Sequence, residues 1–158
     1  MNNELSTDKV KRPKGVWILT IANGVFAGVL PIAGIAIAYY FPESRTALGL
    51  SGFQVFSTVA LGALICQASY QTWKGSGQAK LVLLALITVH WTFIAYNNIS
   101  FILSDSAAAL DQTQRTRIYG NIVRAILWVG VNYWYFLGSR TKLFFRDNAS
   151  RKSKSSEI

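Results

Sequence analysis

The sequence predicts an all-α membrane protein, a bundle of four transmembrane helices. Three long stretches, 16–40, 50–73 and 81–103, contain no Asp, Glu, Lys or Arg, and a fourth, 118–139, contains only Arg124. A helix needs about 20 mostly apolar residues to cross about 30 Å of hydrocarbon, so each stretch is long enough. The remaining charged residues lie between and outside these stretches, which is where loops meet water.

Going along the chain, we expect a basic segment 1–15, a transmembrane domain 16–139 and a basic, disordered tail 140–158. The four spans are expected at about 16–40, 52–73, 79–103 and 118–138. The first span should end before Pro42, because proline stops a helix. It should also remain uncleaved, since its apolar run is longer than the about 7–15 residues of a signal peptide.

The loops predict how the spans are connected. The turn 74–78 is short, so spans two and three should be antiparallel neighbours. In the longer loop 104–117, Ser106 can cap a short interfacial helix that leads into span four, and Asp111 with Arg115 forms an i,i+4 pair of opposite charge. The last residues, 148–158, are rich in Ser and Lys and are expected to be disordered.

The net charge of +9 is explained by topology, and a nucleic-acid partner is not needed. With four crossings, twelve of the 16 basic residues fall on one side and three on the other, Arg45, Arg115 and Arg117. Because Lys and Arg are in excess in cytoplasmic loops, both termini should be cytoplasmic. These basic segments are expected to attract anionic lipid headgroups, at roughly 1 kcal/mol for each cation.

Arg124 is the most informative residue within a span. A cation at membrane depth costs about 2.5–3.5 kcal/mol on insertion scales. Counting about 1.5 Å per residue from Ile118, it lies roughly 9 Å deep. We expect a candidate binding cluster in the outer half of the membrane, between spans three and four; its members are Arg124, Asn97, Asn98, Asn121 and Asp105. The alternatives are a structural arginine that holds neighbouring helices and a residue that recognises an anionic or polar ligand.

Gly24, Gly28 and Pro31 predict a helix-packing face on span one. Small residues four apart let another backbone approach closely in lipid. That other helix belongs either to the same bundle or to a second copy in a homo-oligomer, and the sequence leaves both open. Pro31 should kink the helix and free a carbonyl that needs a new partner.

His90, in the middle of span three, is a secondary site candidate. Metal binding, haem binding or proton transfer would each need a second His or a nearby carboxylate, and the spans contain neither. A hydrogen-bonded core histidine is therefore favoured, and no metal or cofactor is expected. Four other polar residues should form interhelical hydrogen bonds; they are Asn23, Gln67, Gln71 and Asn132.

The last span resembles a known family in two runs. Arg124-Ala125-Ile126-Leu127-Trp128 is followed by Tyr135-Phe136-Leu137-Gly138-Ser139-Arg140-Thr141-Lys142-Leu143-Phe144. This pattern is similar to the end of a family of bacterial four-helix inner-membrane proteins, domain of unknown function 2569. The resemblance covers about 20 residues. It implies the same topology and a bacterial inner-membrane location, and it implies no activity.

Several function classes are excluded by their chemistry. A membrane thiol oxidoreductase needs cysteine pairs, and Cys66 is the only cysteine. A small multidrug proton antiporter needs an intramembrane carboxylate, and the four spans have none. A membrane glutathione-handling enzyme would show charged residues on its second helix. Two hypotheses remain: a non-enzymatic membrane component that binds a partner protein, and a lipid- or small-molecule-binding protein or transporter. An enzyme is less favoured, because no nucleophile–base constellation is visible.

Overall fold

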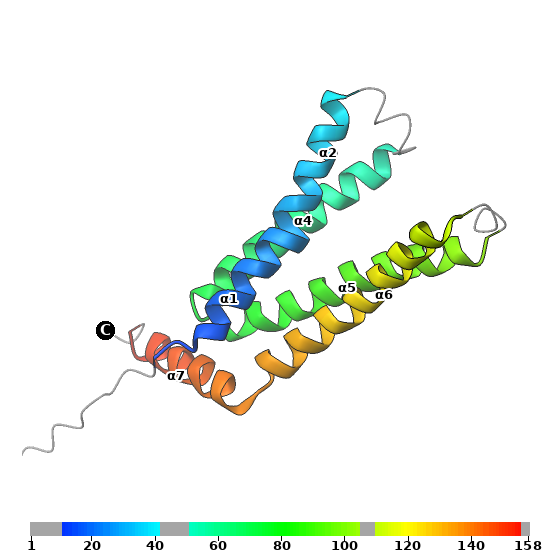
Figure 1. Ribbon diagram of the computed structural model, residues 1–158. Coiled ribbons are helices and arrows are strands. Elements are labelled where there is room, and N and C mark those ends of the chain that lie inside the picture. Colours follow the sequence, from blue (N-terminus) through cyan, green and yellow to red (C-terminus); the bar gives the residue numbers. More distant parts are fainter. Residues whose placement is uncertain (1–10, 42–50, 105–109, 156–158) are drawn as a thin grey trace, which may run out of the picture.

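The computed structural model describes residues 11–41, 51–104 and 110–155, with no side-chain description beyond residue 150. These ranges are helical apart from short turns, and they contain no strand (Figure 1). The first helix consists of α1 (Lys14–Asn23), the π-helix η1 (Gly24–Val29) and α2 (Leu30–Tyr40). It is followed by α4 (Gly52–Trp73), α5 (Gly77–Ile102), α6 (Gln112–Phe136) and α7 (Ser139–Ser155).

Three helices in the described ranges are long and apolar enough to cross a membrane: Lys14–Tyr40, Gly52–Trp73 and Gly77–Ile102. They agree with the first three predicted spans to within two residues. The fourth predicted span corresponds to α6, which has 25 residues but is less apolar, since it contains three arginines. The structure therefore supports an all-helical integral membrane protein with three candidate spans.

Capping boxes mark where two of these helices begin. The Ser51 hydroxyl accepts a hydrogen bond from the Gln54 backbone N–H at 3.2 Å, and the Gln54 side chain accepts one from the Ser51 N–H. Asp111 and Gln114 form the same capping box at the start of α6. Helix α6 thus begins directly after Asp111, and the short helix predicted after Ser106 falls mostly on residues that the structure does not describe. Ser106 lies outside the described residues.

The π-helix η1 is how the first helix accommodates Pro31. Proline lacks an N–H, and its ring clashes with the carbonyl of the residue four positions earlier, which is Ala27. The wider π turns just before it relieve this conflict, and the Leu30 N–H donates to the Val25 carbonyl five residues back. The Gly24 carbonyl accepts a hydrogen bond from the Cys66 thiol of α4 at 3.5 Å. The predicted kink is thus a π segment within a continuous helix.

The Gly24/Gly28 face packs against α4 of the same chain. A Cβ on Gly28 would overlap the Cys66 sulfur and lie 3.1 Å from the Gly62 carbonyl oxygen. A Cβ on Gly62 would lie only 2.8 Å from the Gly28 carbonyl oxygen. The two backbones therefore meet with no side chain between them, as expected for small residues in lipid-facing bundles. The Gly24/Gly28 face, which the sequence also offered to a second copy, is therefore covered by α4 of the same chain.

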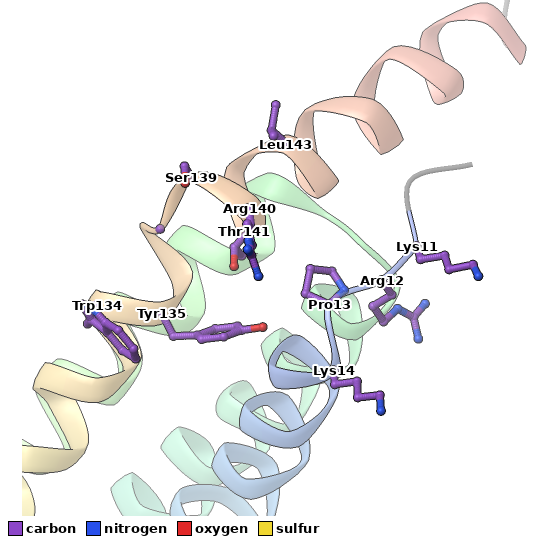
Figure 2. Close-up of a pocket in the computed structure, with 11 residues that line it drawn as sticks. Lys11, Arg12, Pro13, Lys14, Trp134, Tyr135, Ser139, Arg140, Thr141 and Leu143 are labelled. Atoms are coloured by element: carbon purple, nitrogen blue, oxygen red, sulfur yellow. The ribbon is translucent and has the colours of Figure 1, made fainter. Parts of the chain in front are cut away.

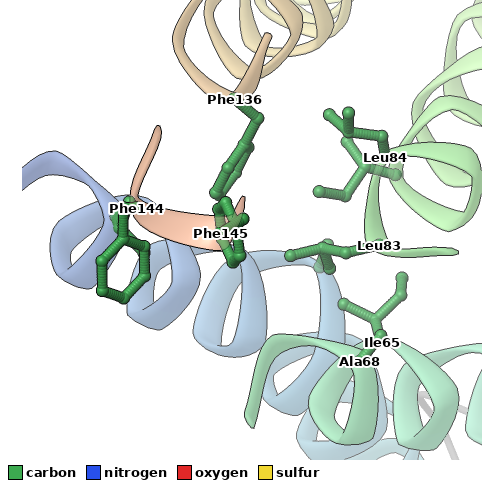
Figure 3. Packing of buried hydrophobic residues seen from close by; sticks show 10 residues of the cluster. Ile65, Ala68, Leu83, Leu84, Phe136, Phe144 and Phe145 are labelled. Atoms are coloured by element: carbon green, nitrogen blue, oxygen red, sulfur yellow. The ribbon is translucent and has the colours of Figure 1, made fainter. Parts of the chain in front are cut away.

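The four long helices form two antiparallel pairs that meet at one end and diverge at the other (Figure 1). We call the end with α7 the base and the other end the open end. The first helix packs on α4, and α5 packs on α6. Most buried residues lie near the base, where all four helices and α7 meet (Figure 3). Toward the open end, no residue of 52–61, 88–102 or 112–124 is buried.

The base is closed by α7, a helix where the sequence predicted disorder. The expectation of a disordered tail is wrong for 140–155, because two apolar side chains anchor this segment. Phe144 and Phe145 are buried in the same cluster as Ile65, Leu83 and Phe136 (Figure 3). Burying a phenylalanine side chain contributes about 1.5–3 kcal/mol, which offsets part of the cost of ordering the segment.

A buried lysine lies beside this anchor. The Lys80 side chain is 8% exposed, and its Nζ donates to the Phe136 carbonyl at 3.4 Å. The same Nζ lies 5.0 Å from the centre of the Phe145 ring. The last carbonyls of a helix are partially negative, so a cation at the end of α6 is favourable. Lys80 therefore joins α5, α6 and α7 at the base.

We expect Gly62→Ala to lower the unfolding free energy by about 1–3 kcal/mol, because a backbone oxygen cannot move aside cheaply. Gly34→Ala is the matched control, since no heavy atom lies within 4 Å of a Cβ at that position. Unfolding in mixed detergent micelles measures both. An equal effect of the two substitutions would contradict the close Gly28–Gly62 contact.

Candidate functional site

The residues of the predicted outer cluster lie toward the open end on α5 and α6. Arg124 and Asn97 are exposed, and Asn121 is half-buried. The Asn98 amide donates to the Ile94 carbonyl of its own helix at 2.7 Å. Asp105 lies outside the described residues. Within the described part of the chain, no hydrogen bond joins Arg124 to these asparagines.

His90 is half-buried on α5. Its ring lies edge-on to the ring of Trp91, with 5.4 Å between the ring centres, and it makes no hydrogen bond to any described residue. No group of three His, Cys, Asp or Glu side chains among the described residues could hold a metal ion. Near His90 the structure shows aromatic packing.

Three residues form a buried polar triad between the first helix and α6. The Asn23 Nδ2 donates to the Asn132 Oδ1 at 2.6 Å, and the Trp128 Nε1 donates to the Asn23 Oδ1 at 2.8 Å. The Asn132 Nδ2 donates to the Trp128 carbonyl at 2.8 Å. Both asparagines are fully buried. The predicted interhelical hydrogen bond is confirmed for Asn23 and Asn132.

The other two residues of that polar set do not form such bonds. Gln67 is exposed and Gln71 is half-buried on α4, and neither side chain bonds to another described residue. A helix presents only part of its circumference to its neighbours, and without the tertiary arrangement the sequence does not say which part. The polar triad is a structural element, because its hydrogen-bonding groups are occupied by one another.

A large pocket lies at the base, between the segment that leads into α1 and the junction of α6 with α7. Its volume is about 790 Å³. The lining residues are four cations, three hydroxyl-bearing side chains and four others: Lys11, Arg12, Lys14, Arg140, Tyr135, Ser139, Thr141, Pro13, Trp134, Gly138 and Leu143. No carboxylate is among them. We call this space the basal pocket.

Figure 2 shows how these side chains lie. The Tyr135 ring and the Arg140 side chain extend from α6 and α7 toward the segment around Pro13. Lys11, Arg12 and Lys14 form the opposite rim, with their side chains extending away from α6. The Tyr135 ring takes the place where a Cβ of residue 15 would lie, so a larger residue at Gly15 would displace this ring from the wall. The pocket thus has one aromatic and hydroxylated side and one basic rim.

Two hydroxyl groups of the basal pocket have no hydrogen-bond partner among the described residues. Thr141 is 2% exposed, yet its hydroxyl bonds to none of them. The Tyr135 hydroxyl also bonds to none. Thr141 and Tyr135 therefore offer two hydroxyls that can bond to a polar ligand or to water in the pocket.

Two helix N-termini add to the positive potential. The first helix begins at Lys14 with no side-chain cap, and α7 begins at Ser139; both positions line the basal pocket. The unpaired N–H groups of a helix N-terminus are equivalent to roughly half a positive charge. The C-terminus of α6 ends beside the same pocket and offsets one of them. The remaining N-terminus and the cations together make the basal pocket suited to an anion.

Arg12 is positioned by aromatic rings. Its guanidinium carbon lies 5.2 Å from the centre of the Trp73 ring and 6.0 Å from that of Phe144. Such cation–π contacts contribute about 0.5–2 kcal/mol. They connect the basic segment before α1 with α4 and α7, and so define the rim of the basal pocket.

The sequence predicted only part of the basal pocket. The basic segments and the aromatic end of the last span were visible, and they predicted a surface that attracts anionic lipid. The meeting of residues 11–14 with residues 134–143 was not visible, because the two segments are more than 100 residues apart.

Comparison with protein families, curated proteins and solved structures found no match to this chain. The assignment of a function therefore rests on the site geometry alone.

We expect a double-mutant cycle on Asn23→Ala and Asn132→Ala to give a coupling of about 0.6–2 kcal/mol in unfolding free energy. Each single substitution leaves the other amide unpaired, so the double variant should be little less stable than either single variant. Asn97→Ala, at an exposed position, should have almost no effect. Strictly additive losses would contradict the polar triad.

Proposed function

We propose that α6 is a fourth transmembrane helix, which gives the chain four crossings. At about 1.5 Å per residue, its 25 residues extend about 37 Å, enough to cross the hydrocarbon. It lies antiparallel beside α5 (Figure 1), and α5 is one of the apolar candidate spans. A helix packed along a membrane-spanning helix shares its depth. The buried Asn132 also finds its partner inside the bundle, which lowers the cost of its polarity.

The base then faces the cytoplasm, with both termini on that side. The uneven distribution of basic residues supports this orientation, because most Lys and Arg residues lie at the base and these residues are in excess in cytoplasmic loops. The exposed Trp134 beside the basal pocket supports it as well, since tryptophan favours the headgroup level. The family that the last span resembles belongs to the bacterial inner membrane, and we propose the same location for this chain.

We propose that the protein is a non-enzymatic membrane component that binds the headgroup of an anionic lipid in its basal pocket. The observation that carries this proposal is the convergence of two helix N-termini, the Arg140 side chain and two unpaired hydroxyls on one pocket without carboxylates. A phosphate can accept hydrogen bonds from Thr141 and Tyr135 and pair with Arg140. Lys11 and Lys14 have flexible stems that can turn toward it.

The surroundings of the basal pocket favour a lipid over a soluble anion. Trp134 is 80% exposed and Leu143 is 50% exposed, and both line it. Its volume falls within the roughly 300–1,000 Å³ typical of sites for whole small molecules. A headgroup with the start of its acyl chains therefore matches both the charge and the apolar rim.

Labelling of single cysteines tests the topology. In a Cys66→Ser background, a cysteine at Thr113 should react with a membrane-impermeant maleimide in intact spheroplasts. A cysteine at Arg146 should react only after the membrane is opened. Labelling of both positions from the same side would overturn the fourth crossing.

Lipid binding tests the basal pocket. Lys11→Gln, Lys14→Gln and Arg140→Gln combined should weaken binding of phosphatidylglycerol about tenfold or more in native mass spectrometry, because three cations that line the pocket are lost. Lys74→Gln, Lys142→Gln and Arg146→Gln remove the same charge from the base but not from the pocket, so their effect should be smaller.

Three further measurements decide whether the basal pocket binds a lipid. Phosphatidylcholine should bind weakly to every variant. Glycerol phosphate, which lacks acyl chains, should not compete at equal concentration, whereas successful competition would indicate a soluble anion. An equal loss in the two triple variants would reduce the interaction to general surface attraction and overturn the proposed site.

A further inference from the structure

Arg124 lies on the side of α6 that faces the first helix. It precedes Trp128 by four residues and Asn132 by eight, so the three side chains are on neighbouring turns of one helix face. At the base this face contacts the first helix, through the hydrogen bonds of Asn23 and the edge-on packing of Phe26 on Trp128, with ring centres 6.0 Å apart. Asn121 continues the same face toward the open end.

Toward the open end, this face of α6 has no partner helix in the described part of the chain. The two helix pairs diverge there, and α2 packs on α4 and η1 (Figure 1). Every described residue from 112 to 124 is exposed or half-buried. We call the part of α6 around Asn121 and Arg124 the open face.

The charge of Arg124 is not balanced by any described residue. Its side chain makes no hydrogen bond or ion pair there, and none of the four spans contains an Asp or Glu. Asp111 is 13 residues away, about 20 Å along the helix, and its carboxylate caps α6 at Gln114. Intramembrane cations are rare and usually pair with an acid or a carbonyl. The described residues therefore offer the open face no complementary acid.

We infer that the open face binds a transmembrane helix of another membrane protein, one that carries a carboxylate at the depth of Arg124. This rests on the proposed crossing by α6. A helix can place a carboxylate at the depth of the Arg124 backbone, whereas a lipid phosphate is reached only when the arginine side chain extends outward to the membrane surface. A second copy of this chain does not fit, since its spans have no acid. Asn121 can donate a further hydrogen bond to the same carboxylate.

The test uses synthetic transmembrane peptides as probes. One is a leucine–alanine helix with a single Asp in its outer half, and the other has Leu at that position. Their binding to the full chain is measured by fluorescence transfer in phosphatidylcholine vesicles. The Asp peptide should bind at least about fivefold more tightly, as expected for an interhelical charge pair. The difference should disappear in Arg124→Leu.

Two controls show whether the preference depends on the position of each charge. Arg117→Leu removes a cation near the membrane surface and should keep the preference for the Asp peptide. A peptide with Asp in its inner half should bind like the Leu peptide. Equal binding of the outer-Asp and Leu peptides, or a preference that survives in Arg124→Leu, would overturn the inference.

The test also distinguishes a lipid phosphate from a partner helix as the group that binds Arg124. If phosphatidylglycerol in the vesicles gives an Arg124-dependent signal and the Asp peptide does not, the anion is a lipid phosphate and the inference fails. The topology is measured separately, by labelling cysteines at residues 113 and 146, so loss of the partner helix and loss of the fourth crossing can be told apart. Helicity measured on Arg124→Leu excludes simple misfolding.

Discussion

The hydrogen bond between Asn23 and Asn132 joins the first helix to α6, and the arrangement of the two helix pairs depends on it. Between helices in lipid there is little hydrophobic driving force, so packing and hydrogen bonds decide which helices associate. An amide left unpaired at this depth would be costly. Trp128 adds a second donor to Asn23, and its ring packs between Phe26 and Trp91. From this level toward the base the core is closed, and toward the open end the two helix pairs separate.

A second constraint is the contact of two backbones at Gly28 and Gly62. It brings the first helix close enough to α4 for the Cys66 thiol to reach the Gly24 carbonyl. The π-helix lies in the same region, between Asn23 and Pro31. A proline, a glycine contact and a buried amide thus act on about two successive turns of the first helix. Beyond these turns α2 continues away from α6 toward the open end (Figure 1).

The base and the open end also differ in chemistry, because the helices pack together at the base and separate at the open end. At the base, α7 folds under the bundle through Phe144 and Phe145, and this brings its N-terminus beside that of α1. Two helix N-termini with nearby cations produce a pocket for an anion at the level of the lipid headgroups. At the open end the helices are less packed, and Arg124 has no acid among the described residues. The two proposed interactions, with lipid and with a partner helix, follow from this asymmetry.

The sequence by itself determined the helical class, the positions of the spans to within a few residues, and the basic end. The length of a stretch without charged residues is a local property of the sequence, so the stretches 16–40, 50–73 and 81–103 were sufficient to place the spans. The tertiary structure alone decided which polar residues meet. Asn23 and Asn132 are 109 positions apart, and Gln67 looked equally suitable in the sequence but is exposed. It also decided that residues 140–155 form a helix, because their polar composition predicts disorder and only docking of two phenylalanines on the bundle overrides it. Burial is set by contacts between distant segments, and the composition of one segment does not specify its neighbours.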